Sequence, residues 1–372
     1  MWHARRQSST TRCSTLSGRR STLFGQHPMV KVAIVTSPDN GSPRVLAESL
    51  NDFIRQTGHH SDVLYELGAV RRLKSSTEVK PVHGFLPWML YKALHFLGDF
   101  RVFKRLKTFD AIVICECCPA AFLKHSLNIQ KLKARVGMRP ILYYEVYYLE
   151  NSPTIVASLR EGNHHLTEQF DWHLAVSEVT EIKGKPQKPW SQIGLYLKSS
   201  GLGPNVKNGL LAVVDFEREG HEEIRRRQLQ ILEELKIPCI SLEKRHTIRE
   251  IRAIYQRATF YFIQSREAFG VPIAECLCCG CYVLMPDASW AMSWRLDEDP
   301  QVHGPGVLAD CFVVYSDVND LRRRMIYLKE SYDLKETPRK IFEVFREYYP
   351  TFYDGNLSSL KEVIRKIQDH DI

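Results

Sequence analysis

Residues 259–287 read TFYFIQSREAFGVPIAECLCCGCYVLMPD, and they follow the order strand, loop, helix, strand. The apolar runs TFYFI and YVLMP are typical of strands that are buried on both faces of a parallel sheet. Pro272 suits the first turn of the helix between them, and Gly280 suits its end. The segment therefore predicts one unit of a doubly wound α/β fold.

The same alternation extends through the chain on both sides of this segment. Strands are expected over 30–37, 62–67, 111–115, 141–144, 173–176, 210–215, 239–242, 259–263, 282–285 and 311–315. Helices are expected over 44–56, 221–235, 247–257, 272–279, 319–332, 337–348 and 357–368. Residues 181–207 are rich in Gly, Pro, Lys and Ser and are expected to connect two domains. Two doubly wound domains would enclose a cleft at the carboxyl ends of their strands, where such proteins bind ligands.

Length and composition bound the class of protein. The chain has 372 residues, 44% of them apolar and 25% charged, which suits a globular protein of two domains. No apolar run approaches the roughly 18 residues of a membrane-spanning helix. Of the ten cysteines, Cys117-Cys118 and Cys278-Cys279 are adjacent pairs, which favours reduced thiols in a cytoplasmic protein over a disulfide framework.

The positive charge is concentrated in the first 28 residues. The formal net charge is +8, and residues 1–28 supply +5 of it, from five arginines and no acid. This distribution argues against a globally basic nucleic-acid-binding protein. We expect residues 1–28 to lie outside the fold as a disordered or non-native extension. Their composition fits an organelle transit peptide or residues upstream of a start at Met29.

The loop and helix of residues 264–280 carry the candidate chemistry. A loop that enters a helix presents free backbone N–H groups and the positive end of the helix dipole, which suit a phosphate or a sugar oxygen. Gly270 allows the backbone to approach a ligand closely. Glu267 and Glu275 are eight positions apart, and a carboxylate there can accept two hydrogen bonds from the vicinal diol of a ribose. The simpler alternative is a pair of surface carboxylates, with Phe269 in the core.

This segment resembles the donor-site signature of family 4 glycosyltransferases, which have the GT-B fold of two Rossmann-like domains. The matching residues are Ser265, Glu267, Ala268, Phe269, Gly270, Pro272, Glu275 and Gly280. The resemblance implies that Glu275 holds the ribose of a nucleotide-diphosphate sugar and that Glu267, as the catalytic residue, contacts the donor hexose. The N–H groups around Phe269, Gly270 and Val271 would face the sugar or the diphosphate. It also implies transfer with retention at the anomeric carbon, and neither a metal nor another cofactor.

The chain departs from the family pattern at the residues that bind the diphosphate. The family usually has Gly-Arg and then Lys-Gly after the first strand of the second domain, whereas this chain has LAVVDFEREGHEEI. Glu219-Gly220 stands in place of Lys-Gly. Arg218, one position away, is either the donor-binding cation or an exposed loop arginine.

Two residues of the first domain are candidates for the reaction centre or the acceptor side. Gly41 lies in the loop after the opening strand, and Glu145 stands where the family often has a histidine. The alternative for Glu145 is a surface glutamate at a strand end.

A cysteine cluster and a basic segment each allow two interpretations. Cys276, Cys278, Cys279 and Cys281 are interpreted as small buried thiols rather than as a zinc site. The basic, aromatic residues 71–107 form either a solvated face over the core or a membrane-interface helix, and peripheral membrane contact is assigned to 85–107.

The sequence thus predicts a cytoplasmic, metal-independent, retaining glycosyltransferase that moves a sugar from a nucleotide sugar to a saccharide or lipid-linked acceptor. Residues 29–195 would form the acceptor-side domain, 196–345 the nucleotide-sugar-binding domain, and 346–372 a C-terminal helix that can cross back to the first domain. One alternative is a non-catalytic GT-B module that binds a nucleotide or a glycan. A nucleic-acid-binding protein is a minor alternative, favoured only by the local basic patch.

Overall fold

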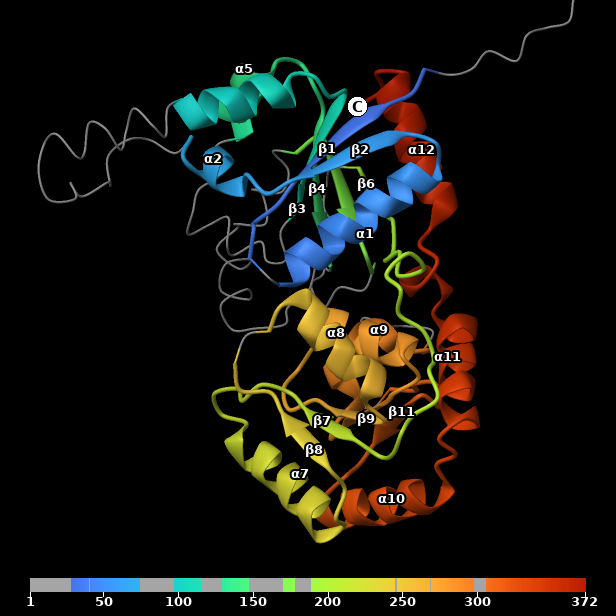
Figure 1. Cartoon of the computed structure of the whole chain (residues 1–372). Helices are drawn as coiled ribbons and strands as arrows, with labels where there is room; N and C mark the ends of the chain where they lie inside the picture. Colours follow the sequence, from blue (N-terminus) through green and yellow to red (C-terminus); the bar gives the residue numbers. More distant parts are fainter. Residues whose placement is uncertain are drawn as a thin grey trace, which may run out of the picture.

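The computed structural model describes residues 28–39, 41–73, 97–115, 129–146, 170–177, 189–244, 246–267, 269–297 and 306–372. Two parallel sheets, each flanked by helices, lie one above the other (Figure 1). The predicted α/β fold with two doubly wound domains is confirmed.

The first sheet has six described parallel strands. Their order is β2 (His60–Leu64), β1 (Lys31–Val35), β3 (Ala111–Cys115), β4 (Ile141–Glu145), β5 (Trp172–Ala175) and β6 (Trp190–Gln192). Strands β3 and β4 are buried along their whole length, because helices cover both faces of the sheet. Helix α1 (Ser42–Gln56) packs on one face. On the other face lie α2 (Leu67–Arg71), the helical residues 97–106 and α5 (Ile129–Val136).

The second sheet has five described parallel strands. Their order is β11 (Phe312–Val314), β10 (Tyr282–Met285), β9 (Phe260–Phe262), β7 (Ala212–Val214) and β8 (Cys239–Ser241). Helices α7 (Glu222–Glu234) and α10 (Val318–Ser331) cover the face away from the first domain. Helices α8 (Ile248–Arg257) and α9 (Val271–Cys278) cover the other face and lie close to the first domain (Figure 1).

The C-terminal segment runs along one side of the molecule from the second domain to the first (Figure 1). It comprises α11 (Glu336–Tyr348), the 3₁₀ helix η3 (Pro350–Phe352) and α12 (Leu357–Gln368). Helix α12 packs beside β6, and Gln368 Nε2 donates a hydrogen bond to the Pro28 carbonyl oxygen at 2.8 Å. Residues of α12, η3 and both sheets belong to one continuous buried cluster. The segment therefore ties the two domains together.

A second segment that connects the two domains, around residues 195–197, runs beside the C-terminal segment. The backbone N–H of Leu195 donates to the Thr351 carbonyl at 2.8 Å, and that of Leu197 donates to the Tyr353 carbonyl at 2.9 Å. In the first domain, Ser49 Oγ of α1 accepts a hydrogen bond from the Tyr196 N–H at 2.8 Å. The two connecting segments are therefore hydrogen-bonded to each other, and the second is also hydrogen-bonded to α1.

Most of the described elements lie where the sequence predicts them. Strands β3 and β10 and helix α12 agree with prediction residue for residue. The prediction that residues 181–207 form only an interdomain connection is wrong, because strand β6 lies inside them. Its three residues, Trp-Ser-Gln, form a half-buried edge strand without an apolar run, so the usual signal of a buried strand is missing.

Helix α9 ends in a Schellman turn built from the cysteine cluster. The N–H of Cys281 donates to the Cys276 carbonyl, and the N–H of Gly280 donates to the Leu277 carbonyl, both at 3.0 Å. Gly280 has a φ of +71°. The four cysteines of the cluster are buried, which confirms the interpretation as small core thiols. Within the described ranges, no group of His, Cys, Asp or Glu side chains is arranged to hold a metal ion.

Gly280→Ala should lower the free energy of unfolding by about 3 kcal/mol or more. The new Cβ would lie 2.3 Å from the Pro338 carbonyl oxygen, in addition to the cost of a left-handed alanine. Gly201 is the matched control, because its φ is +74° but nothing lies within 4 Å of an added Cβ. Gly201→Ala should cost only about 1 kcal/mol. Urea unfolding measures both losses, and equal losses would contradict the close approach of α11 to this turn.

Candidate functional site

A cavity of about 180 Å³ lies between the two domains. The first domain contributes the start of α1, with Gly41, Ser42 and Val45. The second domain contributes Phe216, His246, Ile248, Ile251, Tyr255, Val271, Pro272 and Glu275. The N-terminal ends of α1, α8 and α9 therefore meet here, at the carboxyl ends of the strands. Gly41 and Glu275, both predicted site residues, line the same cavity from opposite domains.

The loop that precedes α9 is held by a buried aromatic stack. Phe269 is fully buried, and its ring stacks on that of Trp294 with centroids 5.2 Å apart. The indole Nε1–H of Trp294 donates a hydrogen bond to the Phe269 carbonyl at 2.5 Å, and the ring of Phe352 meets Phe269 edge to face. Trp294 belongs to the 3₁₀ helix η2 (Ala288–Trp294). The Phe269 side chain is therefore a core anchor and does not line the cavity.

Gly270 turns the chain from this loop into α9. Its φ of +72° is left-handed, and an added Cβ would lie 2.9 Å from Ile273 Cδ1. Val271 and Pro272 then open the helix, with proline in the first turn as predicted. The free N–H groups of a helix start favour negative charge. The start of α9 thus provides an electropositive edge of the cavity.

Glu275 projects from α9 into this cavity while remaining 3% exposed. Its Oε1 accepts a hydrogen bond from Arg252 Nε of α8 at 2.7 Å. Burial raises the pKa of Glu275, and the Arg252 guanidinium opposes that rise. Glu275 is therefore not the surface carboxylate of the alternative interpretation.

Glu267 and Arg218 come together beside the start of α9. Glu267 Oε1 lies 3.5 Å from Arg218 Nη2, and 28% of the Glu267 side chain is exposed. The protein atoms around this carboxyl desolvate it and raise its pKa to about 7; the carboxylate of Asp215 adds to the rise and Arg218 opposes it. The structure thus pairs the predicted cation with the predicted catalytic carboxylate.

Asp215 is a buried acid that the sequence analysis did not single out. It directly follows β7, it is 5% exposed, and burial raises its pKa. The Asp215 carbonyl accepts a hydrogen bond from Gln264 Nε2 at 2.6 Å, which joins the ends of β7 and β9. The signal in the sequence is an acid immediately after the buried run LAVV, at the edge of the sheet where ligands bind.

Glu145 lies apart from the cavity, inside the first domain. It is fully buried at the end of β4, where Tyr143 Oη donates to its Oε2 at 2.8 Å and His173 Nε2 lies 3.5 Å from its Oε1. Burial raises the pKa of Glu145. The interpretation as a surface glutamate is therefore wrong. Among the described residues, Glu145 does not line the cavity that holds Gly41 and Glu275.

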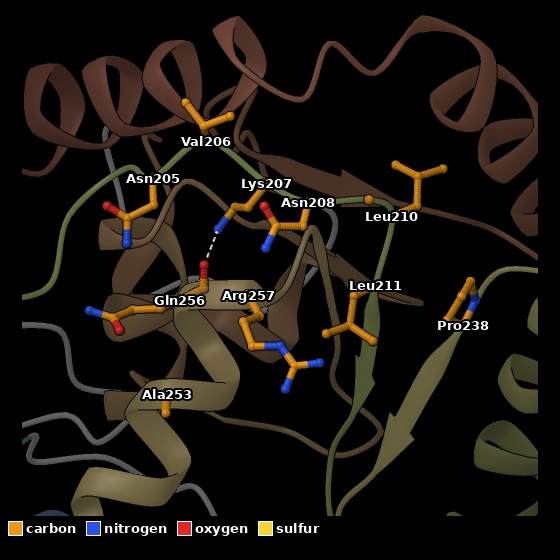
Figure 2. A pocket seen from close by; sticks show the side chains of 11 residues that line it. Asn205, Val206, Lys207, Asn208, Leu210, Leu211, Pro238, Ala253, Gln256 and Arg257 are labelled. Carbon is orange, nitrogen blue, oxygen red and sulfur yellow. Dashed lines mark hydrogen bonds between the residues drawn. The ribbon is translucent and has the colours of Figure 1, made fainter.

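A larger cavity of about 560 Å³ lies at the opposite end of the second sheet, where β7 and β8 begin (Figure 2). Beside it the buried Lys207 donates from Nζ to the carbonyls of Gln256 and Cys279, both at 2.8 Å. These two carbonyls belong to the C-terminal ends of α8 and α9, where a cation is favourable. Lys207 thus caps both helices whose other ends form the interdomain cavity.

The sequence matches no protein-family model and no curated protein, whereas the fold matches solved structures. One is an α-glucosyltransferase in complex with UDP and a 13-mer DNA containing an HMU base, with 13% identity, a TM-score of 0.53, and 91% of this chain and 99% of that chain covered. Another is HepE of Anabaena in complex with UDP-glucose, with 13% identity, a TM-score of 0.51, and 92% and 100% covered. At such identities the likeness shows the fold alone. The chain has the two-domain GT-B fold that these structures share.

Proposed function

We propose that this protein is a glycosyltransferase that uses a nucleotide-diphosphate sugar as donor. Two observations carry the proposal: Glu275 lines the interdomain cavity, and the Glu267–Arg218 pair lies beside the start of α9, next to the lining residues Val271 and Pro272. Glu267 and Arg218 are not themselves among the described residues that line the cavity. A nucleotide-diphosphate sugar needs a cation for its diphosphate and acceptors for its hydroxyl groups, and these three residues supply both. The two similar structures were solved with UDP and with UDP-glucose, which supports the same ligand class here.

Each of these residues has one proposed role. Glu275 accepts hydrogen bonds from the ribose diol, and Glu267 accepts them from hydroxyl groups of the donor sugar. Arg218 binds the diphosphate, assisted by the helix start at Gly270 and Val271. The start of α1 at Gly41 lines the cavity from the first domain, which is the proposed acceptor side.

The proposed reaction proceeds with retention and without a metal. The bond between the anomeric carbon and the diphosphate oxygen breaks, and a bond to the acceptor oxygen forms on the same face. The proton of the acceptor hydroxyl passes to the departing diphosphate, so no protein base is required. Cations and backbone N–H groups stabilise the charge that develops on the leaving group.

A non-catalytic GT-B module is the second candidate. Glu219-Gly220 stands where a Lys-Gly pair would supply a second diphosphate cation, and this departure favours binding without turnover. Hydrolysis or transfer of UDP-, GDP- or ADP-sugars separates the two candidates, because only an enzyme releases the nucleoside diphosphate.

We further propose that the protein is cytoplasmic and contacts an anionic membrane through its first domain, as a lipid-linked acceptor would require. A groove of about 430 Å³ is lined by Arg72, Leu73, Asp99, Phe100, Phe103, Lys104, Lys107 and Arg135. Leu97 and Phe100, at 57% and 59% exposure, lie on the same helical segment. Of the predicted contact segment 85–107, residues 85–96 lie outside the described residues. No helix in the described ranges is long and apolar enough to cross a bilayer.

Glu267→Gln should lower kcat by about tenfold or more while changing nucleotide affinity little, because the amide loses a charge-assisted acceptor for the donor sugar. A pKa of about 7 places Glu267 in its neutral form below that pH, so wild-type turnover should rise as pH increases through about 7. The variant should lose this rise. Glu233→Gln, at an exposed position of α7, is the control. A variant with wild-type turnover and pH profile would remove Glu267 from the reaction.

Turnover should survive EDTA within about twofold, since cations of the protein are proposed to stabilise the leaving group. A metal-dependent glycosyltransferase treated in parallel shows that chelation is complete. Loss of activity that added magnesium or zinc restores would overturn the metal-independent mechanism.

Reversing Lys104, Lys107 and Arg135 to glutamate should abolish flotation with anionic vesicles. Each such cation contributes about 1 kcal/mol near an anionic surface, and salt screens the attraction. Turnover of a short soluble acceptor should persist. The same reversal at three exposed cations of the second domain is the control, at Lys244, Lys335 and Lys340. A wild-type protein that does not float even at low salt contradicts membrane contact.

A further inference from the structure

The Arg252–Glu275 pair joins the two helices that wall the cavity. Helix α8 begins in a capping box, in which Thr247 Oγ1 accepts from the Glu250 N–H and the Glu250 carboxylate accepts from the Thr247 N–H. This cap fixes where α8 begins and so directs Arg252, one turn later, toward α9. The Nε–Oε1 distance is 2.7 Å, with 20% of the Arg252 side chain and 4% of the Glu275 side chain exposed.

Among the described residues, Arg252 is the single hydrogen-bond partner of the Glu275 carboxylate. The bond engages Oε1 and so restricts rotation of the carboxylate, which leaves Oε2 as the free acceptor. Glu275 lines the cavity, whereas Arg252 is not one of its lining residues. The direct contact with a ligand in the cavity is therefore made by Glu275 and not by Arg252.

The other groups around Glu275 do not replace this cation. From α1, Glu48 acts on Glu275 as a like charge, and from α8 the Tyr255 hydroxyl is buried nearby. His246 lines the same cavity. On the same helix and its C-terminal turn, the thiols of Cys276, Cys278 and Cys279 are protonated, since burial raises their pKa. Burial and Glu48 thus favour the neutral carboxyl, and Arg252 is the cation that favours the carboxylate.

We propose that Arg252 is a positioning residue, which orients the Glu275 carboxylate so that its second oxygen accepts hydrogen bonds from the ribose diol of the nucleotide. The inference rests on the proposed function, in which Glu275 binds the donor ribose. Arg252 itself touches neither the nucleotide nor the reacting atoms.

The test is calorimetric titration with UDP, GDP and ADP at about pH 6 and about pH 8.5, for wild type and Arg252→Met. Without its cation the buried carboxyl has a higher pKa, so it is neutral at the lower pH and regains charge as pH rises. Arg252→Met should therefore bind the nucleotide about tenfold more weakly than wild type at the lower pH and recover much of that loss at the higher pH. Wild-type affinity should change much less between the two.

Two control variants separate positioning from a general structural effect. Arg257→Met removes the same charge from the same helix, but Arg257 points into the cavity at the other end of the sheet (Figure 2), so nucleotide affinity should not change. Arg252→Lys keeps a cation beside Glu275 and should restore the flat pH profile. A pH-independent loss in Arg252→Met that lysine does not rescue would overturn the positioning role.

The double variant Arg252→Met/Glu275→Gln keeps the proposal testable if Arg252→Met alone does not fold, because it leaves no buried unpaired charge. If Arg252 acts through Glu275, the double variant should bind the nucleotide as weakly as Glu275→Gln alone, and no weaker. A further loss of about tenfold would show an independent contact and overturn the inference. A wild-type protein that binds none of the three nucleotides refutes the proposed function, and the inference with it. Unchanged affinity in Arg252→Met at both pH values refutes the inference alone.

Discussion

The stack of Phe269 on Trp294 is the interaction on which the site depends. It buries the ring in the middle of the loop that carries Glu267, and the indole N–H fixes the Phe269 carbonyl just before the turn at Gly270. Phe352 packs on the same ring from η3, next to Thr351, which accepts the hydrogen bond from Leu195 at the interdomain crossing. One aromatic cluster therefore sets the start of α9 and also fastens the second domain to the segment that returns to the first.

Near this aromatic cluster lie three acidic side chains whose burial favours the neutral carboxyl group. Burial raises the pKa of Asp215, Glu267 and Glu275, and a different arginine opposes the rise at each glutamate, Arg218 at Glu267 and Arg252 at Glu275. Paired, partly desolvated carboxylates are strong hydrogen-bond acceptors, which suits the hydroxyl groups of a ribose and a hexose. The Arg252–Glu275 pair is costly for stability alone, since the desolvation penalty of a buried ion pair can exceed its Coulombic gain. That cost supports a role in ligand binding.

Much of the fold could be predicted from the sequence, because buried strands such as β3 and β10 leave continuous apolar runs and amphipathic helices such as α12 leave a helical period. The edge strand β6 could not, since three half-buried residues leave no such pattern. For the candidate site, the 259–287 segment predicted Glu267 and Glu275. Their partners Arg218, Asp215 and Arg252 lie on other elements, and only the folded chain shows which of them meet. The burial of Glu145 likewise depends on Tyr143 and on His173 of the neighbouring strand.

A crystal structure of the protein with the nucleoside diphosphate that it binds most tightly would locate the donor site. We expect the nucleotide in the interdomain cavity, with its ribose hydroxyls within hydrogen-bond distance of Glu275 and its diphosphate beside Arg218 and the N–H groups at Gly270 and Val271. A nucleotide bound elsewhere, for example in the larger cavity beside Lys207, would contradict this expectation, as would an interdomain cavity that stays empty at saturating nucleotide.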